Sequence, residues 1–253
     1  MLVIGLGASA LAAMVLVPFR LPVWLALREL SHPDAKVRRA AVRELGGRRV
    51  RAAGDRIAAL ILSDPDPAVR EAAAYAASRL GVRGAAESIR EAVQRWPDEP
   101  GAAQMLASLA RLTGADPRLE PFLEFCRRSG RPYLRIGAAL AMMERGDSRG
   151  AVELLTFGLS APEPVVPVVV DRVCEYIIPA IQMVGGSVPA AETHHGFLSG
   201  VLAWWKSSGS DRLLADSLKS NRLDADTHEV ERLEHARQRV GRALGLLPSP
   251  SSS

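Results

Sequence analysis

Apolar and polar residues alternate with a helical period over most of the chain between Leu25 and Gly185. In the two clearest segments the apolar residues return every one to four positions: Val37, Ala40, Ala41 and Leu45 in the first, and Val69, Ala72, Ala73 and Ala76 in the second. This spacing places them on one face of an α-helix. Alanine and leucine, both strong helix formers, recur throughout. The pattern therefore predicts an all-α fold.

These helical segments repeat along the chain. SHPDAKVRRAA begins at Ser31 and SDPDPAVREAA begins at Ser63, 32 positions later, and weaker copies begin near Arg95, Ser129 and Ser160. In this register one position is mostly apolar: Val37, Val69, Gly101, Leu134 and Val166. Another is mostly acidic: Asp34, Asp66, Asp98, Arg131 and Glu163. Self-similarity at such a period is typical of stacked repeats that share one continuous core.

Each copy contains the signals of a helix start. A serine three residues before an acid predicts a capping box at the pairs Ser31/Asp34, Ser63/Asp66 and Ser160/Glu163. We expect the prolines Pro33, Pro65 and Pro162 in the first turn. Glycines such as Gly81 and Gly114 end these helices, and a second helix follows in each copy. The unit is therefore predicted to be helix–turn–helix.

The pattern S/D-P-D-x-x-V-R-x-x-A-A resembles the HEAT repeat, in particular the short variety of phycobilisome-lyase-type proteins, and the chain has a bacterial character. The resemblance covers about Leu25 to Gly185, or five units. It implies a right-handed α-solenoid whose core positions are Val37, Val69, Leu134 and Val166. It also implies that Arg38 and Arg70 pair with acids of the neighbouring unit, and that Ala102 and Pro167 interrupt this ladder. Val69 should lie in a packing seam and its neighbour Glu71 outside it.

The first residues form a different kind of segment. Met1 to Phe19 contains no charged residue and would span about 28 Å as a helix, close to the thickness of a bilayer core. We expect a transmembrane helix here; a signal peptide, a buried core helix and a wrongly assigned start remain alternatives. Ten basic and four acidic residues follow between Arg20 and Arg56, which predicts a cytoplasmic array.

The predicted domains are a transmembrane helix over 1–20, a repeat solenoid over 21–186, a helical cap over 187–247 and a flexible tail over 248–253. The tryptophan-rich stretch from Gly196 resembles the helix that closes such arrays in bacterial proteins. Asp226 to Leu246 is dense in charge, and its apolar residues are spaced for packing as an end cap.

Composition narrows the possible functions. The chain is 48% hydrophobic with a net charge of +4, which fits a folded protein and does not require a nucleic-acid partner. Cys126 and Cys174 are far apart and form no CxxC pair, so we expect buried free thiols in a reducing compartment.

No catalytic motif is present, whether a phosphate loop, GxSxG or HExxH. His194 and His195 are adjacent, and adjacent side chains rarely bind one ion together. His228, Glu231 and His235 share a helix face, as residues of a charged helix often do by chance. We therefore expect no enzyme activity, no cofactor and no metal. Iron-dependent hydroxylases built on HEAT arrays need repeated His-Glu pairs, and only His228-Glu229 occurs here.

Arg48, Arg49 and Arg51 form a basic cluster between two predicted helices. It is either a solvated loop, a contact with anionic lipid headgroups, or a contact with nucleic acid. The repeat-motif polar positions are Asp34, Arg38, Asp66 and Arg70. Together these features predict a membrane-anchored scaffold or adaptor that binds proteins. A lyase-type or other enzyme accessory subunit and a DNA-binding solenoid are the alternatives.

Overall fold

The computed structural model describes residues 23–114, 116–183, 186, 191 and 193–207, and within these ranges the secondary structure is helical, without strands. The α-helices are α2 (Val23–Glu29), α3 (Ala35–Gly47), α4 (Gly54–Ser63), α5 (Pro67–Leu80), α6 (Ala85–Arg95), α7 (Gly101–Thr113), α8 (Glu120–Arg128), α9 (Pro132–Glu144), α10 (Arg149–Ser160), α11 (Val166–Tyr176), α12 (Ile178–Met183) and α13 (His194–Ser207). Two short 3₁₀ helices, η1 (Arg51–Ala53) and η2 (Pro117–Leu119), precede α4 and α8.

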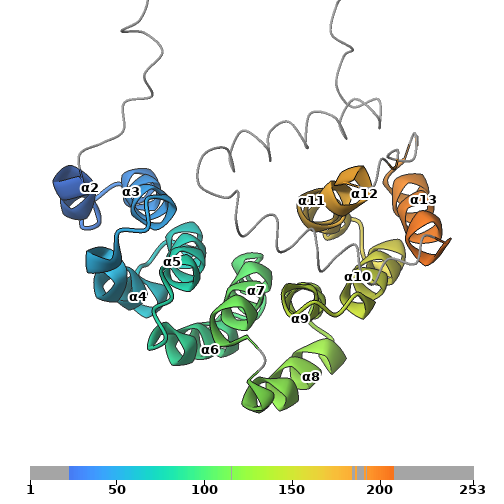
Figure 1. The fold of residues 1–253 in the computed structure, drawn as a ribbon, viewed down its shortest axis with the longest axis horizontal. Helices are drawn as coiled ribbons and strands as arrows, with labels where there is room; N and C mark the ends of the chain where they lie inside the picture. Colours follow the sequence, from blue (N-terminus) through green and yellow to red (C-terminus); the bar gives the residue numbers. More distant parts are fainter. Residues whose placement is uncertain (1–22, 115, 184–185, 187–190, 192, 208–253) are drawn as a thin grey trace, which may run out of the picture.

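The helices form a curved array of two rows (Figure 1). Helices α3, α5, α7 and α9 follow one another along the inner, concave side, and each packs against the next. Helices α4, α6 and α8 line the outer side, where they pack against α5, α7 and α9 respectively. The predicted helix–turn–helix repeat is thus present, and each outer helix packs closely on the inner helix that follows it.

Helix starts lie later than the serines of the repeat motif predict. The N-cap of α3 is Asp34, whose side chain accepts from the Lys36 N–H, and the N-cap of α5 is Asp66, which accepts from the N–H groups of Ala68 and Val69. Ser63 is instead the last residue of α4, and its hydroxyl donates to the Ala59 carbonyl. The predicted capping boxes are therefore wrong.

Proline explains this register in α5. Pro67 occupies the first turn of the helix, and a residue before proline avoids the helical conformation. Asp66 is accordingly extended, with a φ of −88° and a ψ of 123°. From that position its short carboxylate accepts from the free N–H groups two and three positions further on, those of Ala68 and Val69. The helix ends at Gly81, whose φ of +69° lies in the left-handed region that favours glycine.

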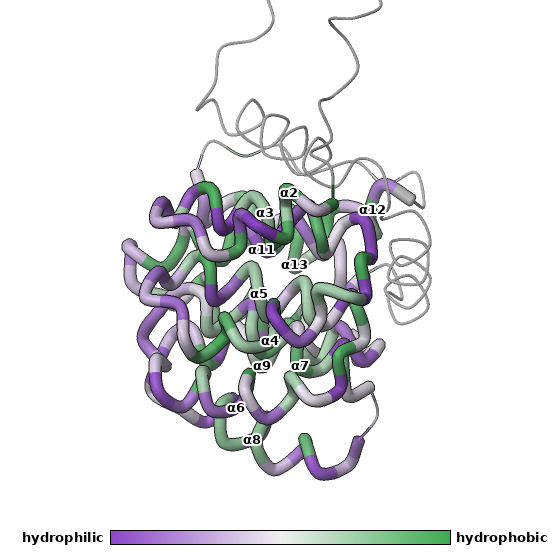
Figure 2. The backbone as a smooth tube through the Cα atoms, turned by 90° about the vertical axis from the view of Figure 1, so that its left-hand side faces the viewer, coloured by the Kyte–Doolittle hydropathy of each residue, from purple (hydrophilic) through white to green (hydrophobic). Residues whose placement is uncertain are grey.

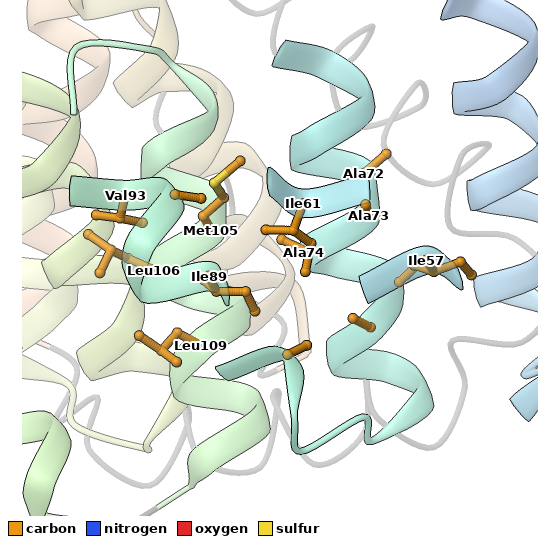
Figure 3. Packing of buried hydrophobic residues seen from close by; sticks show 14 of the residues in the cluster. Ile57, Ile61, Ala72, Ala73, Ala74, Ile89, Val93, Met105, Leu106 and Leu109 are labelled. Atoms are coloured by element: carbon orange, nitrogen blue, oxygen red, sulfur yellow. The ribbon is translucent and has the colours of Figure 1, made fainter. Parts of the chain in front are cut away.

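Small residues let the inner helices approach closely. The buried residues of α5 are dominated by alanine: Ala72, Ala73, Ala74, Ala76 and Ala77. Between the rows the side chains are larger, and Figure 3 shows Ile89 and Val93 of α6 beside Leu106 and Leu109 of α7. Hydrophobic and hydrophilic residues alternate along most helices in Figure 2, as expected for helices with one buried face.

The predicted core positions occupy different depths. Val69, Leu134 and Val166 are buried. Val37, which was expected in the core, is only half-buried. It belongs to α3, which among the described helices is preceded only by the seven-residue α2 and therefore has less cover than a helix inside the array.

The fifth unit departs from the repeat. Helix α11 packs against α10 and the six-residue α12, and α13 packs against α10. A second hydrophobic cluster, with Phe197, Val201 and Trp205 of α13 fully or almost fully buried, joins these helices to α9. The tryptophan-rich stretch therefore forms a helix that covers this end of the described array.

Two predicted segments lie outside the described residues: the membrane helix over 1–20, and the end cap over Asp226–Leu246 with the tail after it. Within the part of the chain that the structure describes, no helix combines the length and apolar character needed to cross a bilayer.

Candidate functional site

Arg38 joins the first two units through their loops. Its Nε and Nη2 atoms donate to the two carboxylate oxygens of Asp64, at 2.7 and 2.8 Å. Its Nη1 atom donates to the carbonyl oxygens of His32 and Pro33, at 2.8 and 2.9 Å. The side chain thus holds its own loop and the next loop in one arrangement.

Arg70 repeats this arrangement one unit later. Its Nη1 donates to the carbonyls of Asp64 and Pro65, at 2.9 and 3.0 Å, and its Nη2 lies 2.6 Å from both carboxylate oxygens of Glu99. The guanidinium also stacks on Trp96, 4.0 Å from the ring centroid. Each arginine therefore binds an acid of the following unit, which is the pairing that the resemblance implies.

The ladder changes at the third unit, where Ala102 replaces the arginine. There Asp98 forms an ion pair with Arg131, which occupies the acidic position of the fourth unit. Both side chains are largely exposed, so this pair contributes less to stability than the buried contacts of Arg38 and Arg70.

The four repeat-motif polar residues are occupied by these structural roles. Asp34 and Asp66 cap helices, while Arg38 and Arg70 tie loops together. Burial alone would raise the pKa of Asp64, but hydrogen bonds from Arg38 and from the Asp66 N–H outweigh it and lower that pKa. The carboxylate is therefore ionised at neutral pH and acts as a fixed acceptor.

A second polar group of residues lies on α5, α7, α9 and α11, and we call it the concave cluster. It consists of Glu71, Tyr75, Gln104, Arg111, Glu144, Arg172, Glu175 and Tyr176. Within it, Arg111 of α7 donates two hydrogen bonds to the Glu144 carboxylate of α9. The Arg111 guanidinium also lies 5.0 Å from the centre of the Tyr75 ring of α5. This part of the cluster joins three neighbouring inner helices.

Arg172 extends the cluster to α11. Its Nη1 donates to Gln104 of α7 at 3.0 Å and to Glu175 at 2.6 Å. Its Nη2 lies 3.6 Å from the Glu71 carboxylate of α5. Residues of the second and fifth units are therefore in contact, although a simple solenoid has contacts only between neighbouring units.

Glu71 consequently differs from the expectation for a position outside the seam. It is half-buried, and its Cβ lies 3.2 Å from the point that a Cβ on Gly101 would occupy. The reason is tertiary: the start of α7 packs beside Glu71, and the Arg172 side chain of α11 reaches its carboxylate.

Tyr176, Arg111 and Arg172 of the concave cluster keep fixed protonation states near neutral pH. Burial raises the pKa of Tyr176 well above its usual value, and the nearby Glu175 raises it further. Burial opposes the charged form of Arg111, but Glu144 outweighs it and raises the pKa. The balance at Arg172 is the same, with Glu175 and Glu71 opposing burial. The cluster can hold charges and hydrogen bonds in place, but these groups do not exchange protons at neutral pH.

The sequence contains a signal for this cluster that the 32-residue register does not use. Gln104 and Arg111 are seven positions apart and Ser108 lies between them, which places all three on one face of an otherwise apolar helix. Ser108 and Gln104 are both buried. Polar residues at core spacing usually find partners, so the pattern could have predicted a buried polar contact. It could not have identified α11 as the partner.

Arg48, Arg49 and Arg51 are exposed in the loop between α3 and α4. Arg48 is the C-cap of α3, Arg49 has a φ of 52°, and Arg51 begins η1. Arg48 Nη1 lies 3.5 Å from Glu44. The cluster is therefore available at the surface, at one edge of the array.

None of the described histidines and cysteines belongs to a group that could hold a metal. The Nδ1 atom of His32 accepts from the Asp34 N–H at 3.0 Å, so His32 is a turn residue. His194 and His195 begin α13, and His228 and His235 lie outside the described residues. Cys126 and Cys174 are free and buried. Among the described residues, no three His, Cys, Asp or Glu side chains are grouped to hold a metal.

Comparison with known proteins agrees with the repeat pattern. Residues 22–110 match a protein-family model described as HEAT repeats. No curated protein and no solved structure matches the chain. The matched range spans the loops bound by Arg38 and Arg70 and helices α2 to α6 with most of α7. The family match and the two-row helical array together support a HEAT-repeat protein.

Proposed function

We propose that this protein is a scaffold that binds other proteins on its helical array and is tethered to a membrane by residues 1–20. HEAT repeats commonly mediate protein–protein interaction, and this chain has them over residues 22–110. We further assign the repeats to the short, phycobilisome-lyase-like variety, because the pattern S/D-P-D-x-x-V-R-x-x-A-A resembles it.

The observation that carries the binding proposal is the way the array is held in one shape. Arg38 and Arg70 fix successive loops, and the concave cluster fixes the inner helices relative to α11. A surface that is already ordered loses little entropy when a partner binds. Such an array presents a long, curved and preorganised surface, which suits docking.

The shifted pKa values also favour binding over catalysis. Catalytic acids and bases need pKa values close to the working pH. Here burial raises the pKa of Cys126 to about 11, and it raises the pKa of Tyr176 well above its usual value. Ion pairing lowers the pKa of Asp147 and raises that of Arg149. All of these shifts move the groups further from neutrality.

The membrane tether rests on the uncharged run from Met1 to Phe19 and on the charges after it. A run of this length can cross a bilayer core of about 30 Å. The ten basic and four acidic residues from Arg20 to Arg56 favour an array on the cytoplasmic side.

An affinity pull-down of tagged full-length protein from washed membranes tests both parts. We expect the protein to remain with the membranes in carbonate and to recover protein partners after detergent extraction. Val69→Asp should lose these partners because it places an unpaired charge in a fully buried position, at a cost of several kcal/mol. It should stay in the membrane fraction because residues 1–20 are unchanged.

The matched control is Gln94→Asp, which introduces the same side chain at an exposed position of α6. It should keep the partners. Retention of partners by Val69→Asp would contradict binding through the folded array. Full-length protein in the soluble fraction would contradict the tether, and about one bound metal per purified chain would contradict the non-catalytic role.

A further inference from the structure

The two edges of the array carry opposite charge. We define the basic edge as the loops that follow inner helices, residues 48–53, 81–84, 116–119 and 145–148. It contains six arginines and two aspartates: Arg48, Arg49, Arg51, Arg83, Arg118, Arg145, Asp116 and Asp147. We define the acidic edge as the loops that precede inner helices, residues 30–34, 64–66, 96–100, 129–131 and 161–165. It contains six acids and one arginine: Asp34, Asp64, Asp66, Asp98, Glu99, Glu163 and Arg131.

Contacts within each edge show that its loops are neighbours. On the acidic edge, the pair Asp98–Arg131 joins the loops before α7 and α9. On the basic edge, a Cβ added to Gly54 would lie 2.9 Å from the Val82 side chain, so the start of α4 touches the loop after α5. The first two loops of the basic edge are therefore adjacent.

Positive charge on the basic edge is concentrated in the first two units. In the third and fourth, Arg118 pairs with Asp116 and Arg145 pairs with Glu120 at the start of α8, so each arginine is matched by an acid. The loops 48–53 and 81–84 contain no acidic residue. Their four arginines, Arg48, Arg49, Arg51 and Arg83, are all exposed.

Trp24 also belongs to the first unit. A five-residue turn joins α2 to α3 and the two helices pack against each other, so they run antiparallel (Figure 1). The first turn of α2, with Trp24 in it, therefore lies away from this turn and about halfway along α3, because α2 has seven residues and α3 thirteen. The Trp24 side chain is 66% exposed. Exposed tryptophans and clustered arginines are both typical of a surface at the lipid headgroup level, and the first unit has both.

We propose that the basic edge of the first two units lies on the anionic headgroups of a phospholipid bilayer, so that the array stands on this edge with its acidic edge away from the membrane. Arg48, Arg49, Arg51 and Arg83 contact the headgroups. This inference deepens the proposed function, because it rests on the tether and adds an orientation to it.

The separation of the two edges makes this orientation stable. An inner helix of 13 residues, such as α3, is about 20 Å long. Electrostatic interactions in physiological salt are screened over about 8 Å. The acidic edge is therefore too far from the bilayer to repel it, while the arginines are close enough to be attracted.

The test uses full-length protein reconstituted into vesicles, with an environment-sensitive dye on a single introduced cysteine. Ala52→Cys places the dye on the basic edge and Ser31→Cys places it on the acidic edge, and both positions are exposed. The native Cys126 and Cys174 are buried and should not react in the folded protein. With phosphatidylserine-containing vesicles we expect a blue shift in the emission of the dye at position 52, and we expect this shift to be lost at high salt. Phosphatidylcholine vesicles should produce no shift at position 52. The dye at position 31 should show no shift with either kind of vesicle.

Two double variants with the same change in net charge separate this edge from general electrostatics. Arg51→Gln with Arg83→Gln removes two arginines from the loops that lack acids, and should abolish most of the shift at position 52. Arg118→Gln with Arg149→Gln removes two arginines that are paired with aspartates, and should leave the shift in place.

Equal loss in both double variants, an equal shift on phosphatidylcholine, or a shift at position 31 would overturn the proposed orientation. A shift at position 52 produced by duplex DNA as strongly as by anionic vesicles would assign the edge to nucleic acid instead. Failure of the full-length protein to remain with vesicles at high salt would contradict the tether. The dye at position 52 reports contact between the basic edge and the vesicles whether or not the tether holds.

Discussion

Asp64 shows how much a single loop residue holds together in this array. Its carboxylate accepts two hydrogen bonds from Arg38 and one, at 2.9 Å, from the Asp66 N–H. Its backbone carbonyl accepts from Arg70. One buried residue therefore connects the first arginine of the ladder to the second. Its ion pair with Arg38 forms only while the carboxylate is ionised.

We predict that Asp64→Asn destabilises the protein at pH 7 by about 3 kcal/mol, because the Arg38 guanidinium loses its counter-charge in a mostly buried position. The pKa of Asp64 is lowered in the folded chain, so its contribution is present above the unfolded pKa of about 4 and is lost as the pH falls through the lower folded pKa. Denaturant titrations at pH 7 and in this acidic window would show both effects.

Asp116→Asn is the control for this prediction. Asp116 also accepts from an arginine, Arg118, but the pair is local, within one loop, and the Arg118 side chain is 85% exposed. We expect little change in stability at any of these pH values. A substitution at Asp64 that leaves the acid dependence of unfolding as steep as in the unmodified protein would contradict the role assigned to it.

At the scale of helices, the contact between α3 and α5 depends on a glycine. A Cβ on Gly46 would lie 2.7 Å from the Cβ of Ala76 and 3.1 Å from its Cα, so the two backbones are too close for any side chain at this position. The next residue, Gly47, has no such neighbour within 4 Å. Adjacent glycines of one helix thus have different roles.

We predict that Gly46→Ala destabilises the protein by about 1–3 kcal/mol, because α3 and α5 must move apart. Gly47→Ala should be neutral or stabilising by up to about 1 kcal/mol, because alanine favours a helix and meets nothing here. Thermal and chemical denaturation of the two variants would measure the difference. Equal effects would show that helix propensity, rather than the close approach, controls this position.

The repeated helices could be predicted from the sequence because apolar period and loop motif are local features. Val69 and Arg70 are examples, since the resemblance to the HEAT repeat assigns one to the core and the other to the ladder. The need for Gly46 could not be predicted, because it depends on where Ala76 lies in space. Gly46 and Gly47 look alike in sequence, as two glycines that end a helix. The exact caps were missed for a similar reason, since Ser63 and Asp66 both suit a helix start and the position of Pro67 decides between them.

For the whole molecule, the concave cluster changes the kind of array that the repeats form. Arg172 of α11 contacts Gln104 of α7 and lies within 3.6 Å of Glu71 of α5. The curved row of inner helices is therefore bridged across its concave side. The 32-residue register does not contain this information, because Arg172 and Glu71 occupy unrelated positions in their units.

This bridge has a consequence for the order in which the chain folds. The packed helix pairs are local in sequence, whereas Arg172 and Glu71 are separated by 101 positions, so their contact closes a long loop whose entropy must be lost first. We predict that Arg172→Ala speeds unfolding in denaturant and leaves the refolding rate nearly unchanged, while Val69→Ala, within a local pair, slows refolding. Stopped-flow measurements would compare them. If Arg172→Ala slowed refolding as much as it lowered stability, the bridge would form early, and the array would assemble around its concave side rather than along its length.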